Sequence, residues 1–224
     1  MHPFGMERKV ETMNKIKAPL LPSQLTRIED LEQMIKTDPY LHGLQVQDCL
    51  VVESTMEQIH FDGCLFQNVD FDNCTFTNMD LLDCRFENCE LSNCKFWEGA
   101  MHRLEFHHCR MMGCDFSGSV LANISFLHNN ARYANFSAAK IKHTRFQDMN
   151  LAMSSFNQCE FTHVEFDACL LQEAEFINTP LHGVDFSSSN IEGITVNSEH
   201  LKGVIVSQEQ ALSLARLLGL VIKE

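Results

Sequence analysis

Long apolar runs, basic residues and secretory features are all scarce in this sequence. No apolar stretch approaches 18 residues, so no membrane-spanning helix is expected. The opening residues, MHPFGMERKVETMNKIKAP, have no continuous apolar segment, so no secretory signal is expected and the protein is predicted to be cytoplasmic. Only 17 Lys and Arg stand against 30 Asp and Glu, a formal charge of −13. Direct nucleic-acid binding, which needs clustered basic residues, is therefore not expected.

Motifs for catalysis, cofactors and metals are missing as well. There is no Gly-rich phosphate-binding loop. There is also no recognisable set of a nucleophile, a general base and a residue that orients the base, so neither an enzyme nor a bound cofactor is expected. The ten cysteines lack the C-x₂-C spacing typical of zinc sites, and a cytosolic redox state disfavours disulfides. Two histidine pairs at a spacing of 20, His108 with His128 and His143 with His163, have no clear third ligand. They are interpreted as solvated surface side chains.

The chain has instead a repeat of five residues. From Leu41 to Val206 every fifth residue is apolar or aromatic over 34 positions, and every phenylalanine except Phe4 falls on this register. The phenylalanines predicted to form the repeating core are Phe66, Phe76, Phe86, Phe96, Phe106, Phe116, Phe126, Phe136, Phe146, Phe156, Phe166, Phe176 and Phe186.

A second register lies two residues earlier and holds all ten cysteines. Its other members are mostly small or apolar, such as Ala134, Thr144 and Val184, which predicts that this position also points inward. A helix would show a period of 3.6 and a strand a period of 2.0. A period of five indicates a chain that turns a corner every fifth residue.

These repeats resemble the motif of the pentapeptide-repeat family: a small residue, a polar residue, Leu or Phe, then two polar residues. Matching segments are CTFTN (Cys74–Asn78), CRFEN (Cys84–Asn88), CDFSG (Cys114–Gly118) and ANFSA (Ala134–Ala138). The resemblance implies an all-β solenoid, a right-handed quadrilateral β-helix with 20 residues per coil. At that spacing residues 41–206 form about eight coils, with two phenylalanine stacks on opposite faces and aliphatic faces between them.

Residues 1–40 are predicted to be an N-terminal extension with a capping helix, because an open solenoid edge must be covered. The segment LTRIEDLEQMIKTDP (Leu25–Pro39) favours the helix, with Thr26 and Glu29 at capping-box spacing and Pro39 as its stop.

Residues 207–224 are predicted to be a C-terminal cap and dimerisation module. Ser207 and Gln210 have capping-box spacing, Gly219 ends the helix, and a strand is expected to follow. The segment carries more apolar residues than one coil edge can cover, which favours pairing with a second subunit over a cap alone. The residues predicted to form the dimer contact are Leu212, Leu214, Ala215, Leu217, Leu218, Leu220 and Ile222.

The coils, residues 41–206, carry 22 acidic and nine basic residues, which accounts for the whole net charge. On a rod of stacked coils this is one excess negative charge per ~3 Å, about half the density of duplex DNA. Acids dominate between Asp48 and Glu90 and again between Asp148 and Glu199, with a more basic middle. The charge favours an acidic rod that fits a DNA-binding surface; the alternative is ordinary charge for solubility.

Within the family the chain looks most like the Qnr-type quinolone-resistance proteins. The resemblance rests on the helical N-terminal cap, the unbroken coils and the apolar tail LKGVIVSQEQALSLARLLGLVI. It implies a homodimer that binds bacterial DNA gyrase and topoisomerase IV as a DNA mimic and protects them from quinolones. The unbroken register leaves no room for the two projecting loops of many Qnr proteins, so the chain is more similar to the loopless Gram-positive and mycobacterial members. The acids expected to bind the partner are Asp148, Glu160, Glu165, Asp167, Glu173, Glu175, Asp185 and Glu192.

Two other functions stay open on the sequence alone. Many pentapeptide-repeat proteins have no connection with topoisomerases, so a protein-interaction scaffold is one alternative. Self-protection against a gyrase-directed natural product is another. Apolar residues at outward positions, Trp97, Met112, Leu82, Leu127 and Tyr133, are mostly ordinary surface residues, and Trp97 is a candidate contact anchor.

Overall fold

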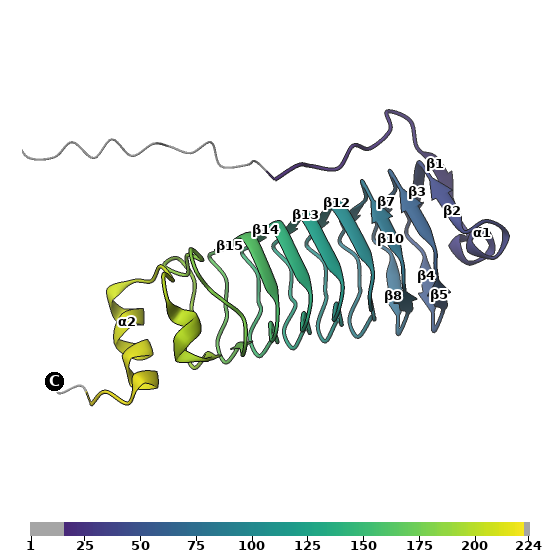
Figure 1. Ribbon diagram of the computed structural model, residues 1–224. Coiled ribbons are helices and arrows are strands. Elements are labelled where there is room, and N and C mark those ends of the chain that lie inside the picture. The colour runs from purple at the N-terminus through teal and green to yellow at the C-terminus, as the bar shows by residue number, and fades with distance from the viewer. Residues whose placement is uncertain (1–15, 222–224) are drawn as a thin grey trace, which may run out of the picture.

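The protein is a straight rod of about eight stacked turns, capped by a short helix at each end (Figure 1). The structure is a computed structural model and describes residues 16–221, without the side chains of Asp72 and Leu218. Every parallel strand pair within the coils joins residues 20 apart, for example Phe66 with Phe86. The predicted right-handed, four-sided β-helix is confirmed. Within residues 16–221 no helix combines the length and apolarity needed to cross a lipid bilayer.

Short strands stack along four faces of the rod. The first face holds β2 (Tyr40–His42), β6 (His60–Asp62) and β10 (Asp80–Leu82). The second holds β1 (Thr26–Ile28), β3 (Leu44–Gln47), β7 (Leu65–Gln67) and β11 (Arg85–Glu87). The third holds β4 (Leu50–Val52) and β8 (Asp70–Asp72); the fourth holds β5 (Thr55–Glu57), β9 (Thr75–Thr77), β16 (Glu175–Phe176) and β17 (Thr195–Val196).

In the later turns longer strands run across the corner between the first and second faces. They are β12 (Ala100–His107), β13 (Val120–Leu127), β14 (Lys140–Gln147) and β15 (Glu160–Asp167). The third and fourth faces of these turns are joined by isolated parallel bridges, again between residues 20 apart. Because each turn bonds to the turns above and below, backbone hydrogen bonding runs along the whole rod.

The core is built from the five-residue register. Its members are buried from Leu41 to Ile191, with Phe161 half-buried, and the last three positions are also half-buried. The phenylalanines form two stacks on opposite faces, with ring centroids 4.6–5.3 Å apart along each stack. Edge-to-face contacts join the two stacks across the rod, such as Phe126 with Phe136 at 6.2 Å. Such ring pairs add about 0.5–1.5 kcal/mol each beyond burial.

The second register, which holds the cysteines, hydrogen-bonds to the neighbouring turn. The Cys114 thiol donates to the Leu91 carbonyl at 2.9 Å, and the other eight cysteine thiols from Cys64 to Cys169 likewise donate to the carbonyl 23 residues back. Ser119 does the same with the Phe96 carbonyl at 2.6 Å. A small donor at this corner therefore fills the space and satisfies a buried carbonyl.

A third register was not predicted from the sequence. From Gly43 to Asn178 the residue two places after each core position always has a left-handed backbone, with φ between 47° and 69°. Glycine, asparagine and aspartate tolerate this conformation best, and they occupy many of these positions in the first half of the rod. The enrichment is visible in the sequence once the corner geometry is known.

The N-terminal cap differs from the predicted helix. Thr26 begins strand β1, which pairs with β3, rather than a helix, so the proposed capping box at Thr26 and Glu29 is wrong. The helix α1 spans Leu31–Thr37, and its N-cap is Asp30, whose carboxylate accepts from the Gln33 amide at 2.9 Å. The strand formed because β3 offers an unpaired edge at the first turn, which local helix signals do not reveal. Leu31 is buried against the first turn, as a cap requires.

Residues 16–25, here called the strap, run back along the rod beside the corner between the first and second faces (Figure 1). The Leu20 amide donates to Asp83 Oδ1 at 2.9 Å, and the Lys17 amide donates to Asn123 Oδ1 at 3.3 Å. Asp83 is almost fully buried and receives two hydrogen bonds from the Arg103 guanidinium, at 2.6 and 2.5 Å. The strap is thus tied to a buried ion pair.

Pro22 of the strap lies over two corner glycines. A Cβ on Gly63 would stand 2.8 Å from Pro22 Cδ, and one on Gly43 would be 3.7 Å from its Cγ. Gly63 therefore does two things: it adopts the left-handed backbone without strain, and it leaves room for Pro22 of the strap to come close.

The C-terminal cap matches the predicted helix start. The helix α2 spans Gln208–Ala215 and begins with the capping box of Ser207 and Gln210. Gln210 also donates to the carbonyls of Phe186 and Ser189, at 2.9 and 2.6 Å, which holds α2 to the last turn. Two 3₁₀ helices flank it, η1 (Ser198–Leu201) and η2 (Arg216–Leu218), and Gly219 ends the segment with a left-handed backbone.

The strand expected after Gly219 is not formed by its described residues. Leu220 and Val221 belong to no strand, because a strand needs a neighbouring edge and the single chain offers none there. Ile222 lies outside the described residues.

Candidate protein-binding surfaces

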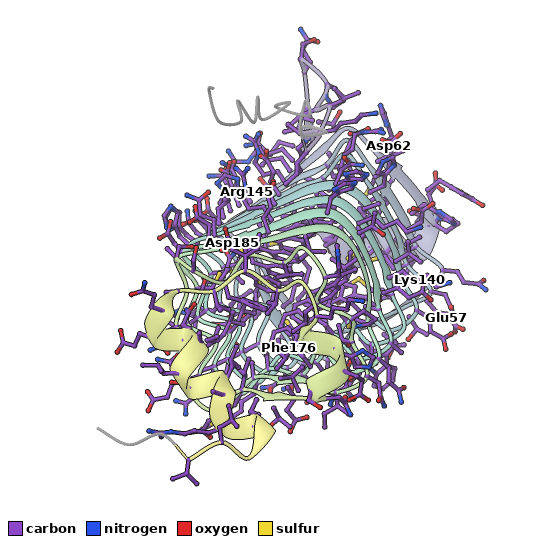
Figure 2. The ribbon with its side chains drawn as sticks, turned by 60° about the vertical axis from the view of Figure 1, so that its left-hand side comes forward. Glu57, Asp62, Lys140, Arg145, Phe176 and Asp185 are labelled. Carbon is purple, nitrogen blue, oxygen red and sulfur yellow. The ribbon has the colours of Figure 1, made fainter. Side chains whose placement is uncertain are left out.

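The eight acids expected to bind a partner are spread over all four faces, not gathered on one. Asp148, Glu165, Asp167 and Asp185 lie on or beside the second face, Glu173 and Glu192 on the third, Glu160 on the first and Glu175 on the fourth. Figure 2, a view close to the rod axis, shows Asp185 and Arg145 on one side, Lys140 on another, and Phe176 in the interior. The second face therefore carries the largest group.

Two of the eight acids are partly neutralised by the preceding turn: Glu165 by Arg145 at 2.7 Å and Glu160 by Lys140 at 3.7 Å. Asp148 lies 3.6 Å from the His128 imidazole of the preceding turn. These contacts are with outward residues 20 positions back, which the coil spacing brings onto adjacent turns. The basic middle of the rod is in this way tied to its acidic C-terminal part.

Five of the eight acids have no basic side chain within ion-pair distance among residues 16–221: Asp167, Glu173, Glu175, Asp185 and Glu192. Asp167 accepts a hydrogen bond from the Ser188 hydroxyl at 3.2 Å, and Asp185 accepts from the Ser187 amide at 2.8 Å. Glu175 accepts from the Asn157 amide group at 2.8 Å. Asp167, Glu173, Asp185 and Glu192 are here called the free acids: none is ion-paired within the described residues, and none accepts from a side-chain amide as Glu175 does.

The interior formed by residues 16–221 offers no room for a ligand. A void of about 10 Å³ among Phe61, Phe66 and their neighbours could hold at most one water molecule. A larger hollow, about 500 Å³, lies open to solvent between the last turn and α2, where Ser189, Glu192 and Gln210 line it. Within the described part of the chain, no three His, Cys, Asp or Glu side chains are placed to hold a metal ion.

The cysteines have the environment of structural residues. All ten are free thiols, and all except the half-buried Cys49 are buried. Burial raises the pKa of Cys159 and of Cys169 to about 12, so these two thiols stay protonated and weakly nucleophilic near neutral pH. The histidine pairs lie as expected from their spacing: His108 stacks on His128 at 5.0 Å and His143 on His163 at 4.9 Å.

The residues predicted to form the dimer contact fall into two groups. Leu214 is buried against the last turn, and Ala215 is half-buried, so both belong to the cap of this chain. Leu212, Leu217 and Leu220 are exposed by 46–57%. The exposed group remains the predicted contact with a second subunit; nothing is described for the Leu218 side chain, and Ile222 lies outside the described residues.

Trp97, singled out from the sequence, is partly covered by polar neighbours. The Lys95 ammonium lies over its ring at 5.0 Å from the centroid. Burial alone would raise the pKa of Asp115, but hydrogen bonds from Trp97, Ser117 and Asn135 outweigh it and hold that pKa below its usual value. Trp97 is therefore part of a satisfied polar network on the fourth face.

A more open apolar group lies at the edge of the third face, where Met112, Tyr133 and Met153 are exposed by 37–50%. Arg132 lies beside them, with its guanidinium carbon 4.8 Å from the Tyr133 ring centroid. Of these residues, Met112 and Tyr133 were noted as outward apolar positions in the sequence. Met153 was not among them, although it occupies the same corner position as Tyr133 one turn later.

Comparisons with known proteins agree on the repeat. Three sequence profiles match: "Pentapeptide repeats (9 copies)" at residues 52–96, "Pentapeptide repeat region" at 79–156 and "Pentapeptide repeats (8 copies)" at 150–195. A comparison with curated protein sequences gave no significant match.

Two solved structures illustrate the likeness. A trypsin-treated variant of QnrB1, described as a plasmid-mediated fluoroquinolone resistance protein, covers 80% of this chain and 100% of its own length, with 20% identity and a TM-score of 0.52. HetL, a pentapeptide repeat protein involved in heterocyst differentiation regulation from the cyanobacterium Nostoc, covers 74% of this chain and 86% of its own, with 11% identity and a TM-score of 0.34. At such identities the likeness is one of fold. With its repeats, its four-sided coil and these profile matches, the chain belongs to the pentapeptide-repeat family.

Proposed function

We propose that this protein binds bacterial DNA gyrase and topoisomerase IV as a DNA-shaped acidic rod and thereby protects them from quinolones. The observation that carries the proposal is the combination of a straight, internally stacked rod with free acids along its C-terminal half. A protein surface that binds DNA is basic and elongated, and such a surface attracts a rod of the same charge sign as DNA.

The proposal also explains why the acids stand on a rigid support. Stacked rings and continuous parallel hydrogen bonds hold the outward side chains at fixed spacing, one turn apart. Acidic side chains on a rigid backbone lose less conformational entropy on binding than those on a flexible one. A larger part of their electrostatic attraction to the partner therefore contributes to the binding free energy. The shared fold with QnrB1, a fluoroquinolone resistance protein, supports this choice of partner.

The direct test is a supercoiling assay. Purified gyrase is incubated with relaxed plasmid, with and without ciprofloxacin, across a titration of this protein. Restored supercoiling in the presence of ciprofloxacin at protein concentrations near that of gyrase is the expected result. A protein that leaves both reactions unchanged at a large molar excess would point to a scaffold with another partner, and the proposal would be abandoned.

Neutralising the free acids should weaken gyrase binding by about tenfold or more near 0.1 M salt, because each removed charge loses attraction to a basic surface. The variant combines Asp167→Asn, Glu173→Gln, Asp185→Asn and Glu192→Gln, which keep side-chain size and the hydrogen bonds from Ser188 and Ser187. Binding is measured by biolayer interferometry at several salt concentrations.

The matched control removes four acids from the first turns: Glu53→Gln, Glu57→Gln, Asp62→Asn and Asp80→Asn. It changes the net charge by the same amount. Equal loss of affinity in both variants would show that only total charge matters, and unchanged affinity in the first would rule out the free acids as the contact.

The protein is proposed to act as a homodimer joined through the exposed side of α2. Replacing Leu212 and Leu217 with aspartate should convert a dimer to a monomer in size-exclusion chromatography with light scattering, because the exposed leucines would no longer be covered. Leu214→Asp is the contrasting variant: it buries a charge inside the cap and should lower stability instead. A wild-type protein that elutes as a monomer at micromolar concentration would exclude this dimer.

A further inference from the structure

The edge of the third face carries a group of side chains that the acidic surface does not use. We define the methionine–tyrosine patch as Met112, Arg132, Tyr133 and Met153. The chain places these residues on three successive turns: the Gly113 amide bonds to the Arg132 carbonyl, and the Tyr133 amide bonds to the Ala152 carbonyl. Met112 therefore stands one turn before Arg132, and Tyr133 stands one turn before Met153.

The patch is open on its outer side. Met112 is exposed by 45%, Tyr133 by 50% and Met153 by 37%. The position one turn before Tyr133 is Gly113, which has no side chain to cover the ring. Tyrosine, arginine and methionine are the residue types enriched at the centres of protein–protein contacts. The patch has that composition in an exposed position.

Arg132 is held in place without a counter-ion. Its guanidinium lies over the Tyr133 ring, and its Nη2 reaches the Met153 sulfur at 3.6 Å. Its Nε is buried and has no hydrogen-bond partner among residues 16–221, and no carboxylate of that range lies within ion-pair distance of it. Arg85, Arg103, Arg110 and Arg145 all have such a carboxylate. A half-buried cation fixed on apolar groups is pre-organised for an anion from outside.

We infer that the methionine–tyrosine patch is a second contact surface for the protein partner, fitting a carboxylate flanked by apolar side chains. Charge complementarity with the unpaired Arg132 selects the carboxylate, and the exposed methionines and tyrosine select its apolar neighbours. This inference rests on the proposed function, because it assigns the patch to the same topoisomerase. The rod then contacts that partner in two ways: free acids against basic residues, and the patch against an acidic one.

The experiment measures binding of purified gyrase and topoisomerase IV to the full-length protein, using Tyr133→Asn and, separately, Arg132→Gln. Asparagine suits the left-handed backbone at residue 133, where φ is 63°, so the turn is preserved. Each variant should raise the Kd about tenfold, the effect of losing a central contact residue. Circular dichroism and the thermal midpoint verify that both variants fold like the wild type.

The control is Tyr40→Asn, which removes another exposed tyrosine, 67% exposed, from the first turn. It should leave the Kd within twofold of the wild type. If the wild type binds the topoisomerases and both patch variants bind equally well, the patch is not a contact, and the proposed function stands. If the wild type binds neither topoisomerase, the proposed function fails and this assignment of the patch fails with it.

Discussion

Phe126→Ala is expected to lower the free energy of unfolding by about 3–5 kcal/mol. The Phe126 ring is fully buried and stacks on Phe106 and Phe146, both at 5.0 Å, with edge contacts to Phe116 and Phe136 at 6.2 Å. Alanine would lose the burial of the ring and all four aromatic contacts. The turns cannot close over the cavity, because backbone hydrogen bonds hold them at strand spacing.

Urea unfolding followed by far-ultraviolet circular dichroism measures this effect. Leu127→Ala is the control: it removes an apolar side chain from the next residue, which points outward and is half-buried. The control should cost less than about 1 kcal/mol. Comparable losses in the two variants would contradict the role given to the stacks.

Asp83→Asn is expected to cost about 2–3 kcal/mol, the second large effect. The substitution keeps the size of the side chain and suits the left-handed backbone, where φ is 54°, but it leaves the half-buried Arg103 guanidinium without its counter-charge. Because the neutral amide oxygen of asparagine is a weaker acceptor for the Leu20 amide than the carboxylate is, the strap should loosen. Hydrogen exchange at Leu20 should therefore speed up more than exchange at core amides.

The stability that the Asp83–Arg103 ion pair contributes should depend on pH. Burial alone would raise the pKa of Asp83, but hydrogen bonds from Arg103 and Leu20 and the Arg103 charge outweigh it, so the folded-state pKa lies below the usual value. The ion pair therefore adds stability above the unfolded-state pKa of about 3.9, and this contribution is lost as pH falls through the folded-state value.

The wild type should therefore exceed the Asp83→Asn variant in stability near neutral pH, and the margin should shrink below about pH 4. Thermal midpoints at a series of pH values measure it. A margin that stays unchanged to pH 2 would show that the carboxylate charge is not what holds the strap.

The solenoid itself could be predicted from the sequence because one physical requirement recurs at each corner. Phe and Leu side chains every fifth residue must all reach the same axis, and only a chain that turns at that interval allows it. The inward direction of the cysteine register could likewise be predicted. Its hydrogen bonds, such as that from Cys114 to the Leu91 carbonyl, become apparent only when the turns are stacked.

The ends were harder to predict, because their structure depends on partners distant in the chain. Thr26 has the local signals of a helix start, yet it pairs with Leu44 at the open edge of the second face. The strap has no periodic signal, and its path is set by a carboxylate 63 residues away, that of Asp83. Such contacts follow from the completed rod and not from local preference.

The surfaces were predicted in part. Sequence spacing shows which acids are 20 residues apart, but it does not show that Glu165 is neutralised by Arg145 whereas Asp185 is not. In the same way, Arg132 and Tyr133 look like ordinary neighbours in the sequence. Their stacking, together with the Met153 contact from the next turn, appears only in three dimensions.

The uniform spacing of 20 residues between bonded turns has a consequence for how such a chain changes length over time. Duplication of 20 residues would insert one more equivalent coil without disturbing the coils on either side, because each coil bonds only to its immediate neighbours. Gain or loss of a single residue would instead turn every later phenylalanine away from the axis until the count is restored. Related sequences are therefore expected to differ in length by whole 20-residue coils, with shorter insertions and deletions confined to the two caps.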